Sequence, residues 1–408
     1  MTHRFQTNIC GFPSMNFQCD ICIVGNGVIG KAAAVGLAQA GLSVVLLCPP
    51  AHQRQQDAAW DVRVYALNRT ARDLLDSIKA WDTLDHGRVA PVDSMVIHGD
   101  SARAGKISFD AWGARAHELA WIIEDRNLEQ ALDGAIRFAS KLTVVEGQSD
   151  RIEVGASAVK LWLTDGRSID ARLLVGADGR QSWVRGQYDI GITYRSYGQR
   201  AVVSNFDCEI PHHGMAQQWF TDRQGVIALL PLPGNRVSLV WSAPEALAHQ
   251  LQREPLAQLA ETLSQLPGQR VGRLTPLQPE AVQAIPLVFL QTESMIGPRV
   301  VLAGDAAHVV HPLAGHGMNL GFGDVACLVR ILSERDALND CGDERLLRRY
   351  ARARKEDVLL MQLATDGLER LFAADLEPVR FLRNVGMDLL DRLPFVKRRL
   401  IAHAMGAL

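Results

Sequence analysis

The chain has 408 residues, a formal net charge of −2 and 48% hydrophobic residues. Its length suggests two or three domains with sizeable cores, and its ordinary composition excludes a disordered or fibrous protein. The balanced charge gives no support to nucleic-acid binding, which usually needs a basic excess. Seven cysteines are an odd and sparse set, so a disulfide framework is not expected and a reducing cytoplasm fits better.

The first elements form a βαβ unit. Cys19–Val24 is predicted to be a buried strand, Val28–Ala40 a helix and Ser43–Leu47 a second buried strand, which favours a parallel sheet. The segment between the first strand and the helix spells GxGxxG, and such a loop with its helix N-terminus can bind a pyrophosphate. The candidate binding residues are Gly25, Gly27, Val28, Ile29 and Gly30.

Two cysteine positions near this unit need separate interpretation. Cys19 and Cys22 form a CxxC pattern, but it runs into the strand instead of opening a helix, so we interpret it as structural. Cys48 stands at the end of the second strand, where such folds usually carry an acidic residue for the ribose hydroxyls. The adenosine end of a nucleotide must therefore be held in another way or more weakly.

Short strands and helices follow. Helices are predicted at Thr70–Ser77 and Arg126–Phe138, and strands at Ser94–His98, Lys106–Phe109, Leu142–Glu146, Lys160–Thr164 and Ile169–Val175. The pattern then changes to strands alone, which is typical of an antiparallel sheet, at Ala201–Phe206, Met215–Phe220, Gly225–Pro231 and Val237–Ser242. After them we expect a helix at Pro244–Leu263, a buried strand at Val300–Ala303, a helix at Gly317–Leu332 and helical structure from Arg345 onward.

A second polar loop follows the strand at Val300–Ala303. Gly304 and Asp305 come directly after that strand, and a glycine-bracketed loop then leads into the helix from Gly317. A fixed carboxylate beside a helix N-terminus indicates a second ligand-binding loop, although a glycine-rich connector remains the alternative. His308 and His311 have the spacing of a metal-binding pair, but the loop explains them better, so no metal is predicted.

Nucleotide-binding segments thus lie on both sides of the antiparallel block. This order predicts an α/β fold in which a Rossmann-like domain carries an inserted, mainly antiparallel β domain and ends in a helical C-terminal extension.

The motifs, taken together, resemble the FAD-dependent aromatic hydroxylases of the para-hydroxybenzoate hydroxylase type, and within them the ubiquinone-biosynthesis hydroxylase branch. The resemblance runs from about residue 18 to Gly406. It is carried by the GxGxxG segment, by Asp61-x-Arg63-x-x-Ala66-Leu67, by Gly176-Ala177-Asp178-Gly179, and by Gly304–His308 with Pro312 and Gly315–Gly321. His316 departs from the branch, which usually has glutamine there, and Gly225-Val226 replaces a common Gly-Pro.

The resemblance implies an FAD-binding domain of residues 18–85, 112–186 and 290–345. It implies a substrate domain of residues 86–111 and 187–289, and a C-terminal helical region of residues 346–408. The residues expected to bind FAD are Gly25, Gly27, Val28, Ile29, Gly30, Arg63, Arg126, Asp178, Gly304, Asp305, Pro312, Gly315, Gly317, Met318 and Asn319.

The implied activity is a monooxygenase reaction that uses NAD(P)H and O2 to hydroxylate the ring of a polyprenyl phenol or quinol in ubiquinone biosynthesis, through a flavin C4a-hydroperoxide. Pro312, His316 and Gly317 would surround the flavin ring, and no dedicated nucleophile is needed. Gln218, Phe220, Leu230 and Trp241 could contact the substrate, or they could be ordinary sheet and core residues.

Two other functions stay open at this point. The chain could hydroxylate a soluble aromatic metabolite, or it could bind FAD without turnover as a subunit of a biosynthetic assembly. Residues 1–17 lack the features of a signal peptide, and no apolar run reaches the ~18 residues that span a bilayer, which favours a cytoplasmic location. The basic, amphipathic stretch Pro378–Leu408 could contact the inner membrane or a partner, or pack on its own domain.

Overall fold

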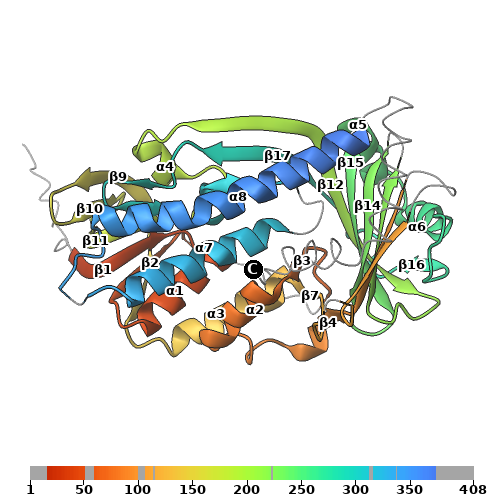
Figure 1. Cartoon of the computed structure of the whole chain (residues 1–408), viewed down its shortest axis with the longest axis horizontal. Helices are drawn as coiled ribbons and strands as arrows, with labels where there is room; N and C mark the ends of the chain where they lie inside the picture. The colour runs from red at the N-terminus through yellow and green to blue at the C-terminus, as the bar shows by residue number, and fades with distance from the viewer. Residues whose placement is uncertain are drawn as a thin grey trace, which may run out of the picture.

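The computed structural model describes residues 16–50, 59–99, 106–113, 115–221, 224–311, 316–336 and 338–373, with side chains up to residue 367 except that of His316. Figure 1 shows an elongated molecule, with helices packed on a parallel sheet at one end and a large antiparallel sheet at the other. The long helix α8 (Glu344–Ala373) runs along both parts.

Sheet A is the parallel sheet. β1 (Asn16–Val24) lies in its middle, between β2 (Val44–Cys48) and β11 (Ser168–Gly176), and these three strands are parallel. Residues 21–24 of β1 are buried because other layers cover both faces of the sheet. The remaining strands are β8 (Leu142–Glu146), β9 (Ser149–Val154), β10 (Val159–Leu163), β18 (Ile296–Gly297) and β19 (Val300–Leu302).

Four helices and α8 build the main core beside sheet A. They share one cluster of buried residues, which includes Leu75, Leu132, Phe322 and Tyr350 from four different helices. These helices are α1 (Val28–Gln39), α2 (Arg69–Ser77), α3 (Asp125–Arg137) and α7 (His316–Ser333), and a short α4 (Trp183–Gln187) follows β11.

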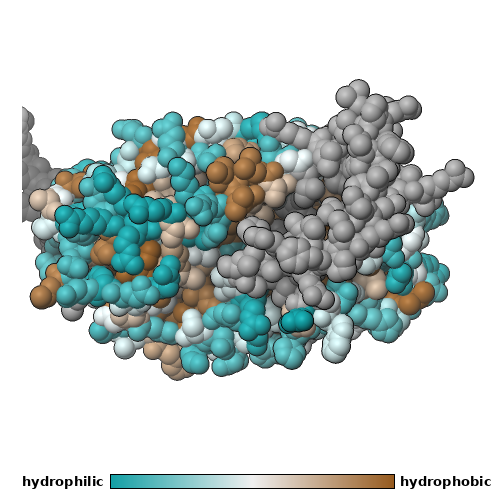
Figure 2. All heavy atoms as spheres, in the orientation of Figure 1, coloured by the Kyte–Doolittle hydropathy of each residue, from teal (hydrophilic) through white to brown (hydrophobic). Residues whose placement is uncertain are grey.

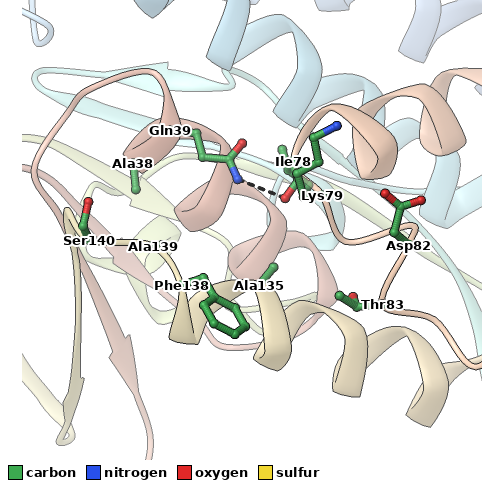
Figure 3. A pocket seen from close by; sticks show the side chains of 10 residues that line it. All are labelled: Ala38, Gln39, Ile78, Lys79, Asp82, Thr83, Ala135, Phe138, Ala139 and Ser140. Carbon is green, nitrogen blue, oxygen red and sulfur yellow. Dashed lines mark hydrogen bonds between the residues drawn. The ribbon is translucent and has the colours of Figure 1, made fainter.

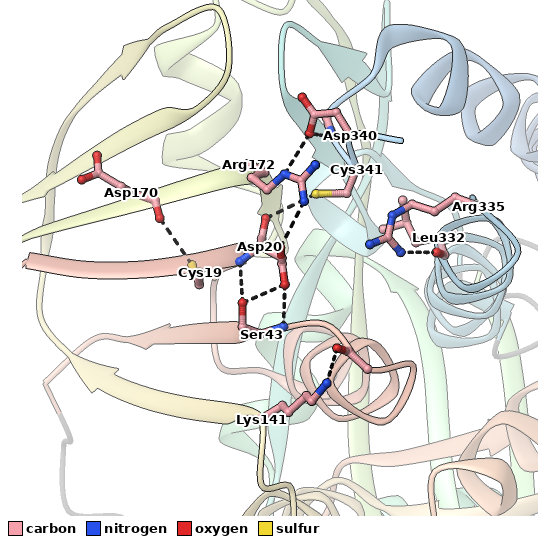
Figure 4. A network of polar contacts seen from close by, with 12 residues as sticks. Cys19, Asp20, Ser43, Lys141, Asp170, Arg172, Leu332, Arg335, Asp340 and Cys341 are labelled. Atoms are coloured by element: carbon pink, nitrogen blue, oxygen red, sulfur yellow. Dashed lines mark hydrogen bonds and ion pairs between the residues drawn. The ribbon is translucent and has the colours of Figure 1, made fainter. Parts of the chain in front are cut away.

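An ionic network closes the amino-terminal edge of sheet A (Figure 4). Asp20 accepts hydrogen bonds from the backbone N–H and the hydroxyl of Ser43, at 2.9 and 2.8 Å. Arg172 lies 3.4 Å from Asp20 and 3.3 Å from Asp340, and the Cys341 thiol donates to the Asp20 carbonyl oxygen. The network ties the connection between α7 and α8 to the sheet, which fixes where α8 begins.

Sheet B is a small sheet between the two ends of the molecule, formed by β3 (Val64–Leu67), β7 (Ala120–Glu124) and β4 (Val89–Val92). A short 3-10 turn at His86–Arg88 precedes β4. The apolar face of sheet B packs against Ala216 and Leu232 of the antiparallel sheet. The three strands of sheet B are only four or five residues long, and the sequence pattern did not predict them.

Sheet C is the antiparallel sheet, with nine strands and one parallel pair, β13 with β5. Helices α5 (Glu245–Arg253) and α6 (Leu256–Ser264) cover one of its faces. Its strands are β5 (Ser94–His98), β6 (Lys106–Asp110), β12 (Ile192–Cys208), β13 (Met215–Thr221), β14 (Gly225–Leu232), β15 (Arg236–Pro244), β16 (Leu274–Pro276), β17 (Gln283–Thr292) and β20 (His308–Val309).

The predicted fold class is confirmed: strands of sheet A come from both sides of the antiparallel block in the sequence. The single helix predicted at Pro244–Leu263 is wrong, because the structure has two helices there. Glu254 has extended backbone angles and Pro255 starts the second helix, since proline lacks an N–H and disfavours helical angles in the residue before it. The predicted C-terminal helix is present to Ala373, while Pro378–Leu408 lies outside the described residues.

In the part of the chain that the structure describes, no helix is both long and apolar enough to cross a membrane. The same residues contain no group of three or more histidine, cysteine or acidic side chains that could bind a metal ion. Six described cysteines are free, and burial raises the pKa of the Cys19 thiol to about 12, which makes it unreactive.

Candidate active site

Two glycines bring the GxGxxG loop against the loop after β11. Gly25 has a φ of 114°, and a Cβ atom on it would lie 2.3 Å from the Ala177 carbonyl oxygen. A Cβ atom on Gly30 would lie 1.9 Å from the Gly25 carbonyl oxygen. A larger residue at Gly25 would therefore force the two loops apart, and one at Gly30 would distort the turn of the GxGxxG loop itself.

The loop after β19 packs on the same place. Gly304, with a φ of 61°, lies against the Ile29 side chain, and so does Gly321 in α7. A Cβ atom on Gly321 would be 3.3 Å from the Gly304 Cα atom. The starts of α1 and α7 and both glycine loops thus meet at the carboxyl edge of sheet A, where α/β folds bind their ligands.

The first turns of α1 and α7 present backbone donors. Gly27 caps α1 without a side-chain hydrogen bond, and neither first turn contains an acidic residue. Among the described residues, nothing lies within 4 Å of a Cβ atom built on Gly27 or Gly317. The Val28 side chain is in the core and that of Ile29 fills the space beside Gly304, so these two residues can reach a ligand only through their N–H groups.

Cys48 is the last residue of β2, where such folds usually carry an acidic residue for the ribose hydroxyls. It is buried at the end of β2, and burial raises the pKa of its thiol, against the effect of Lys31 and of a hydrogen bond with Asn26. The Lys31 ammonium lies 2.7 Å from Asp133. A lysine and an asparagine therefore surround the position that usually carries an acid.

Asp305 is an exposed residue in the loop after β19. Its side chain is accessible to solvent, yet the surrounding protein raises the pKa of its carboxyl, with His308, Arg63 and Arg180 acting in the opposite direction. A group that is accessible and still desolvated must have protein on most sides. The carboxyl is therefore a fixed acceptor for hydroxyl groups.

Arg63 belongs to a polar group that the sequence analysis found only in part. Its Nη1 atom lies 3.8 Å from Asp125, and its Nη2 donates to the Tyr65 hydroxyl at 3.2 Å. Tyr65 donates to Asp125 at 3.0 Å, and burial raises the pKa of its hydroxyl. Arg126 follows Asp125 on the first turn of α3 and donates to the Ala59 carbonyl at 3.5 Å. The sequence motifs did not include Tyr65 and Asp125. Their positions close to the predicted residues Arg63 and Arg126 were the only indication of them.

Asp178 lies in the loop between β11 and α4 and has one unused oxygen. Its Oδ2 accepts from the Val184 N–H at 3.0 Å, whereas Oδ1 is buried and has no partner among the described residues. The buried Arg185 donates to the carbonyl oxygens of Ala306 and Arg180, at 2.8 and 2.9 Å. Arg185, which no motif indicated, therefore joins the loop after β11 to the loop after β19.

A fully buried carboxylate fixes the loop of Asp305 from behind. Asp324 in α7 accepts from the Gly304 N–H at 2.9 Å, contacts His308 Nε2 at 2.8 Å and pairs with Arg354 of α8 at 2.8 Å. Burial alone would raise the pKa of Asp324, but His308 and Arg354 outweigh it and hold the pKa below its usual value. Sequence spacing gave no signal for this cluster.

Asn319 uses its side chain within the protein. Its Oδ1 accepts from the Asn68 N–H at 2.9 Å and its Nδ2 donates to the Ala66 carbonyl at 2.8 Å, which docks the first turn of α7 on β3. His316 is the first residue of α7, and its side chain is not among those described. Pro312 and Gly315 lie outside the described residues.

Three of the four predicted substrate residues share one face of sheet C. In the register, Gln218 pairs with Ala228, Phe220 with Val226 and Leu230 with Ser238, all on the face away from α5 and α6. Trp241 pairs with Ile227, packs in the core under those helices and donates from Nε1 to the Gln224 carbonyl at 2.7 Å. Alternate strand residues point to opposite faces, so the interpretation of Trp241 as a substrate residue is corrected to a core residue.

The face that carries Gln218 mixes apolar side chains with the buried polar residues Asn205, Ser238 and Ser242, and it turns toward the Arg63 segment. Its half-buried side chains in β14 and β15 are Val226, Ala228, Leu230 and Val240. Asn205 on the same face donates to the Asp61 carbonyl at 2.9 Å. A surface with half-buried apolar side chains therefore turns toward the segment that contains Asp61 and Arg63.

One surface pocket lies away from these loops. It has a volume of about 450 Å³ between the ends of α1, α2 and α3, and Gln39 donates to the Ile78 carbonyl beside it at 3.0 Å (Figure 3). None of the residues of the glycine motifs lines it.

The comparisons with known proteins agree with this geometry. The family "FAD binding domain" matches residues 18–361. Ubiquinone hydroxylase UbiL of Rhodospirillum rubrum is 34% identical, over 95% of this chain and 90% of its own length. The 3-demethoxyubiquinol 3-hydroxylase of Escherichia coli is 33% identical, over 96% and 99%.

Solved structures show the same fold at lower identity. The p-nitrophenol 4-monooxygenase PnpA of Pseudomonas putida superposes with a TM-score of 0.75 at 17% identity, covering 96% of this chain and 98% of its own. Klebsiella pneumoniae HpxO, solved with FAD and uric acid, gives a TM-score of 0.71 at 18% identity, over 94% and 97%.

Proposed function

The chain belongs to the FAD-binding-domain family and is an FAD-dependent monooxygenase, and on that premise we propose that it hydroxylates the aromatic ring of a polyprenyl phenol or quinol in ubiquinone biosynthesis. NAD(P)H and O2 are the co-substrates of this reaction. The observation that carries the proposal is identity of 33–34% with two ubiquinone-pathway hydroxylases over nearly the whole chain. A soluble aromatic substrate and a non-catalytic subunit are not favoured.

The structure fits FAD, which supplies the oxygen-activating redox chemistry when it is bound. The N–H groups of α1 after Gly27 would hold the pyrophosphate, and Asp305 would accept the ribityl hydroxyls. Asp178, with its unused oxygen, belongs to one of the loops that converge there. The residues we assign to FAD are Gly25, Gly27, Val28, Ile29, Gly30, Arg63, Arg126, Asp178, Gly304, Asp305, Pro312, Gly315, Gly317, Met318 and Asn319.

The start of α7 would handle charge at the reacting end of the cofactor. The N–H groups of Gly317, Met318 and Asn319 lie at the positive end of the helix dipole, where they stabilise negative charge. Asn319 keeps this turn in place through its two hydrogen bonds with the strand below. Pro312 and His316 would complete the surroundings of the ring and limit the access of water.

The substrate would lie between these loops and sheet C. Gln218, Phe220 and Leu230 belong to the face that looks toward the Arg63 segment, and the half-buried side chains around them are apolar. Such a face suits an aromatic ring with a hydrocarbon tail, because apolar contact is favourable in proportion to the area removed from water. Trp241 would stabilise the sheet from behind.

Purified protein tests the proposal. We expect a yellow protein with a flavin absorbance spectrum, and NAD(P)H oxidation that increases when a prenylated phenol with a short chain is added. Mass spectrometry should find one added oxygen atom on that phenol. A colourless protein that takes up no added FAD would refute the proposal, and so would a flavoprotein that hydroxylates only phenols without a prenyl group.

We also propose peripheral contact with the inner membrane or with a biosynthetic partner. Figure 2 shows a hydrophobic group over the middle of α8, and this helix carries the exposed side chains of Leu359, Leu360 and Leu363. Flotation with anionic vesicles would test membrane contact, and a chain ending after α8 that floats like the full chain would exclude the basic stretch as its cause.

A further inference from the structure

His311 lies where the loop after β19 meets sheet C. The chain leaves this loop as β20, which pairs with β17 through Val309 and Leu290. His311 comes two residues after β20 and five residues before the start of α7, and its side chain is only 1% exposed. It is therefore a buried titratable group between the polar loops and the sheet that carries the apolar face.

A β-bulge directs two side chains of β12 at this histidine. The register of β12 with β17 shifts between Ser196 and Gln199, and Gly198 takes a φ of 66° there. The Tyr197 ring meets the His311 ring edge-on, with 4.7 Å between the ring centres. Bulges of this kind re-aim side chains and are common beside active sites.

The contact with Gln199 sets the tautomer of His311. His311 Nε2 lies 3.0 Å from Gln199 Oε1, an oxygen that can only accept, so Nε2 carries the proton. Nδ1 is then an acceptor, and it is buried without a partner among the described residues. Burial lowers the pKa of His311 to about 4 in spite of Asp366, so the ring is neutral near pH 7.

A buried acceptor without a partner is costly, and native proteins rarely keep one without a reason. We propose that His311 Nδ1 accepts the hydrogen bond of the ring hydroxyl of the aromatic substrate, an inference that rests on the proposed function. An acceptor that draws on the O–H proton leaves more electron density on the ring, which favours attack by an electrophilic oxygen. Gln199 holds the imidazole in the orientation and tautomer that this requires.

Two substitutions of His311 distinguish the role of its Nδ1 atom from that of its Nε2 atom. In His311→Asn the amide oxygen can stand near the place of Nδ1 and keep the acceptor, whereas in His311→Gln the amide reaches toward the place of Nε2 and the acceptor is lost. His98→Gln is the matched control. His98 also has a buried nitrogen without a partner and a pKa that burial lowers to about 4, but it stacks on Trp219, away from the glycine loops.

The experiment compares a phenol that carries one isoprene unit with its methyl ether, which has no hydroxyl proton. For each FAD-loaded protein we measure the dissociation constant of both ligands from the change in the flavin spectrum, and kcat/KM for both. In the unchanged protein and in His98→Gln, methylation should lower affinity and kcat/KM by about 10- to 100-fold, the usual size for a hydrogen bond to a buried acceptor.

In His311→Gln the two ligands should differ by no more than about 2-fold, while His311→Asn should retain most of the difference. An equal methylation effect in His311→Gln and the unchanged protein would overturn the role of His311. If the unchanged protein binds FAD but hydroxylates neither compound, the proposed function fails, and the dissociation constants still decide whether His311 binds the hydroxyl.

Discussion

Removal of the Asp324 charge gives the clearest prediction about the loop of Asp305. Asp324 is fully buried and supplies one acceptor to Gly304, one to His308 and one to Arg354. In Asp324→Asn the shape of the side chain is kept, but the Arg354 guanidinium loses its buried counter-charge and keeps only the exposed Asp357 as an ion-pair partner. The amide keeps only one acceptor oxygen, so Gly304, His308 and Arg354 can no longer all be satisfied, and both stability and cofactor binding should suffer.

The size of the effect follows from the burial of the pair. Leaving one charge of a buried pair uncompensated costs about 3–5 kcal/mol. An unfolding entropy of about 2.1 cal/mol/K per residue gives roughly 0.9 kcal/mol/K for a chain of this length, so the melting temperature should fall by about 3–6 °C. The double variant Asp324→Leu with Arg354→Met should lose less than the sum of the single variants, because no buried charge is left without a partner.

The assay is thermal unfolding and FAD titration of Asp324→Asn, of the double variant and of its two single variants. FAD affinity should fall in Asp324→Asn and recover only in part in the double variant, since leucine supplies no acceptor for the Gly304 N–H. The low pKa of Asp324 also fixes the sign of the pH effect: its stabilisation is complete above the ordinary value of 3.8 and is lost as the pH falls through the folded pKa. A melting temperature unchanged in Asp324→Asn at pH 7 would refute this reasoning.

Three further predictions concern other parts of the molecule. Gly30→Ala should abolish FAD binding and lower the melting temperature, because its Cβ atom would lie 1.9 Å from a backbone oxygen. Gly27→Ala has open space around its Cβ atom and should keep the fold. Equal melting temperatures of the two variants would contradict this prediction. Trp241→Ala should destabilise the protein by about 3–5 kcal/mol, as for other buried aromatic residues, while Leu230→Ala should mainly raise the KM of a prenylated phenol; a KM that responds only to Trp241 would reverse the two assignments. The pKa of His98 is lowered to about 4, so the unfolded state binds a proton on this histidine at a higher pH than the folded state does. The free energy of unfolding should therefore decrease as the pH falls from about 6.5 to 4. In His98→Gln, denaturation curves measured across this range should show a smaller decrease.

Much of the fold could be predicted because its signals are local. Continuous apolar runs such as Ile21–Val24 indicate strands covered on both faces, and a glycine loop after such a strand restricts the backbone to one kind of turn. The strands of sheet B gave a weak signal, since each is short and half-buried. Pro255 did offer a signal, and the single helix was predicted only because the apolar spacing continues across it.

The candidate site was predictable where motif residues themselves form it, as with Gly25, Gly30 and Asp305. Tyr65, Asp125 and Arg185 were missed because each acts through a partner far away in the sequence, such as Ala306 for Arg185. A sequence pattern shows which residue type stands at each of these positions, but it does not show which distant residue that side chain contacts.

By itself, the sequence determined the two glycine loops, the parallel sheet and the inserted antiparallel sheet, because these depend on residue spacing within one strand, turn or helix. Only the tertiary structure decided which face of sheet C Trp241 occupies, that Asp324 and Arg354 fix the loop of Asp305, and that a bulge in β12 sets Gln199 against His311. The register between strands and the packing of helices bring these residues together. Gln199 and His311, for example, are more than a hundred residues apart in the chain, and no local spacing predicts their contact.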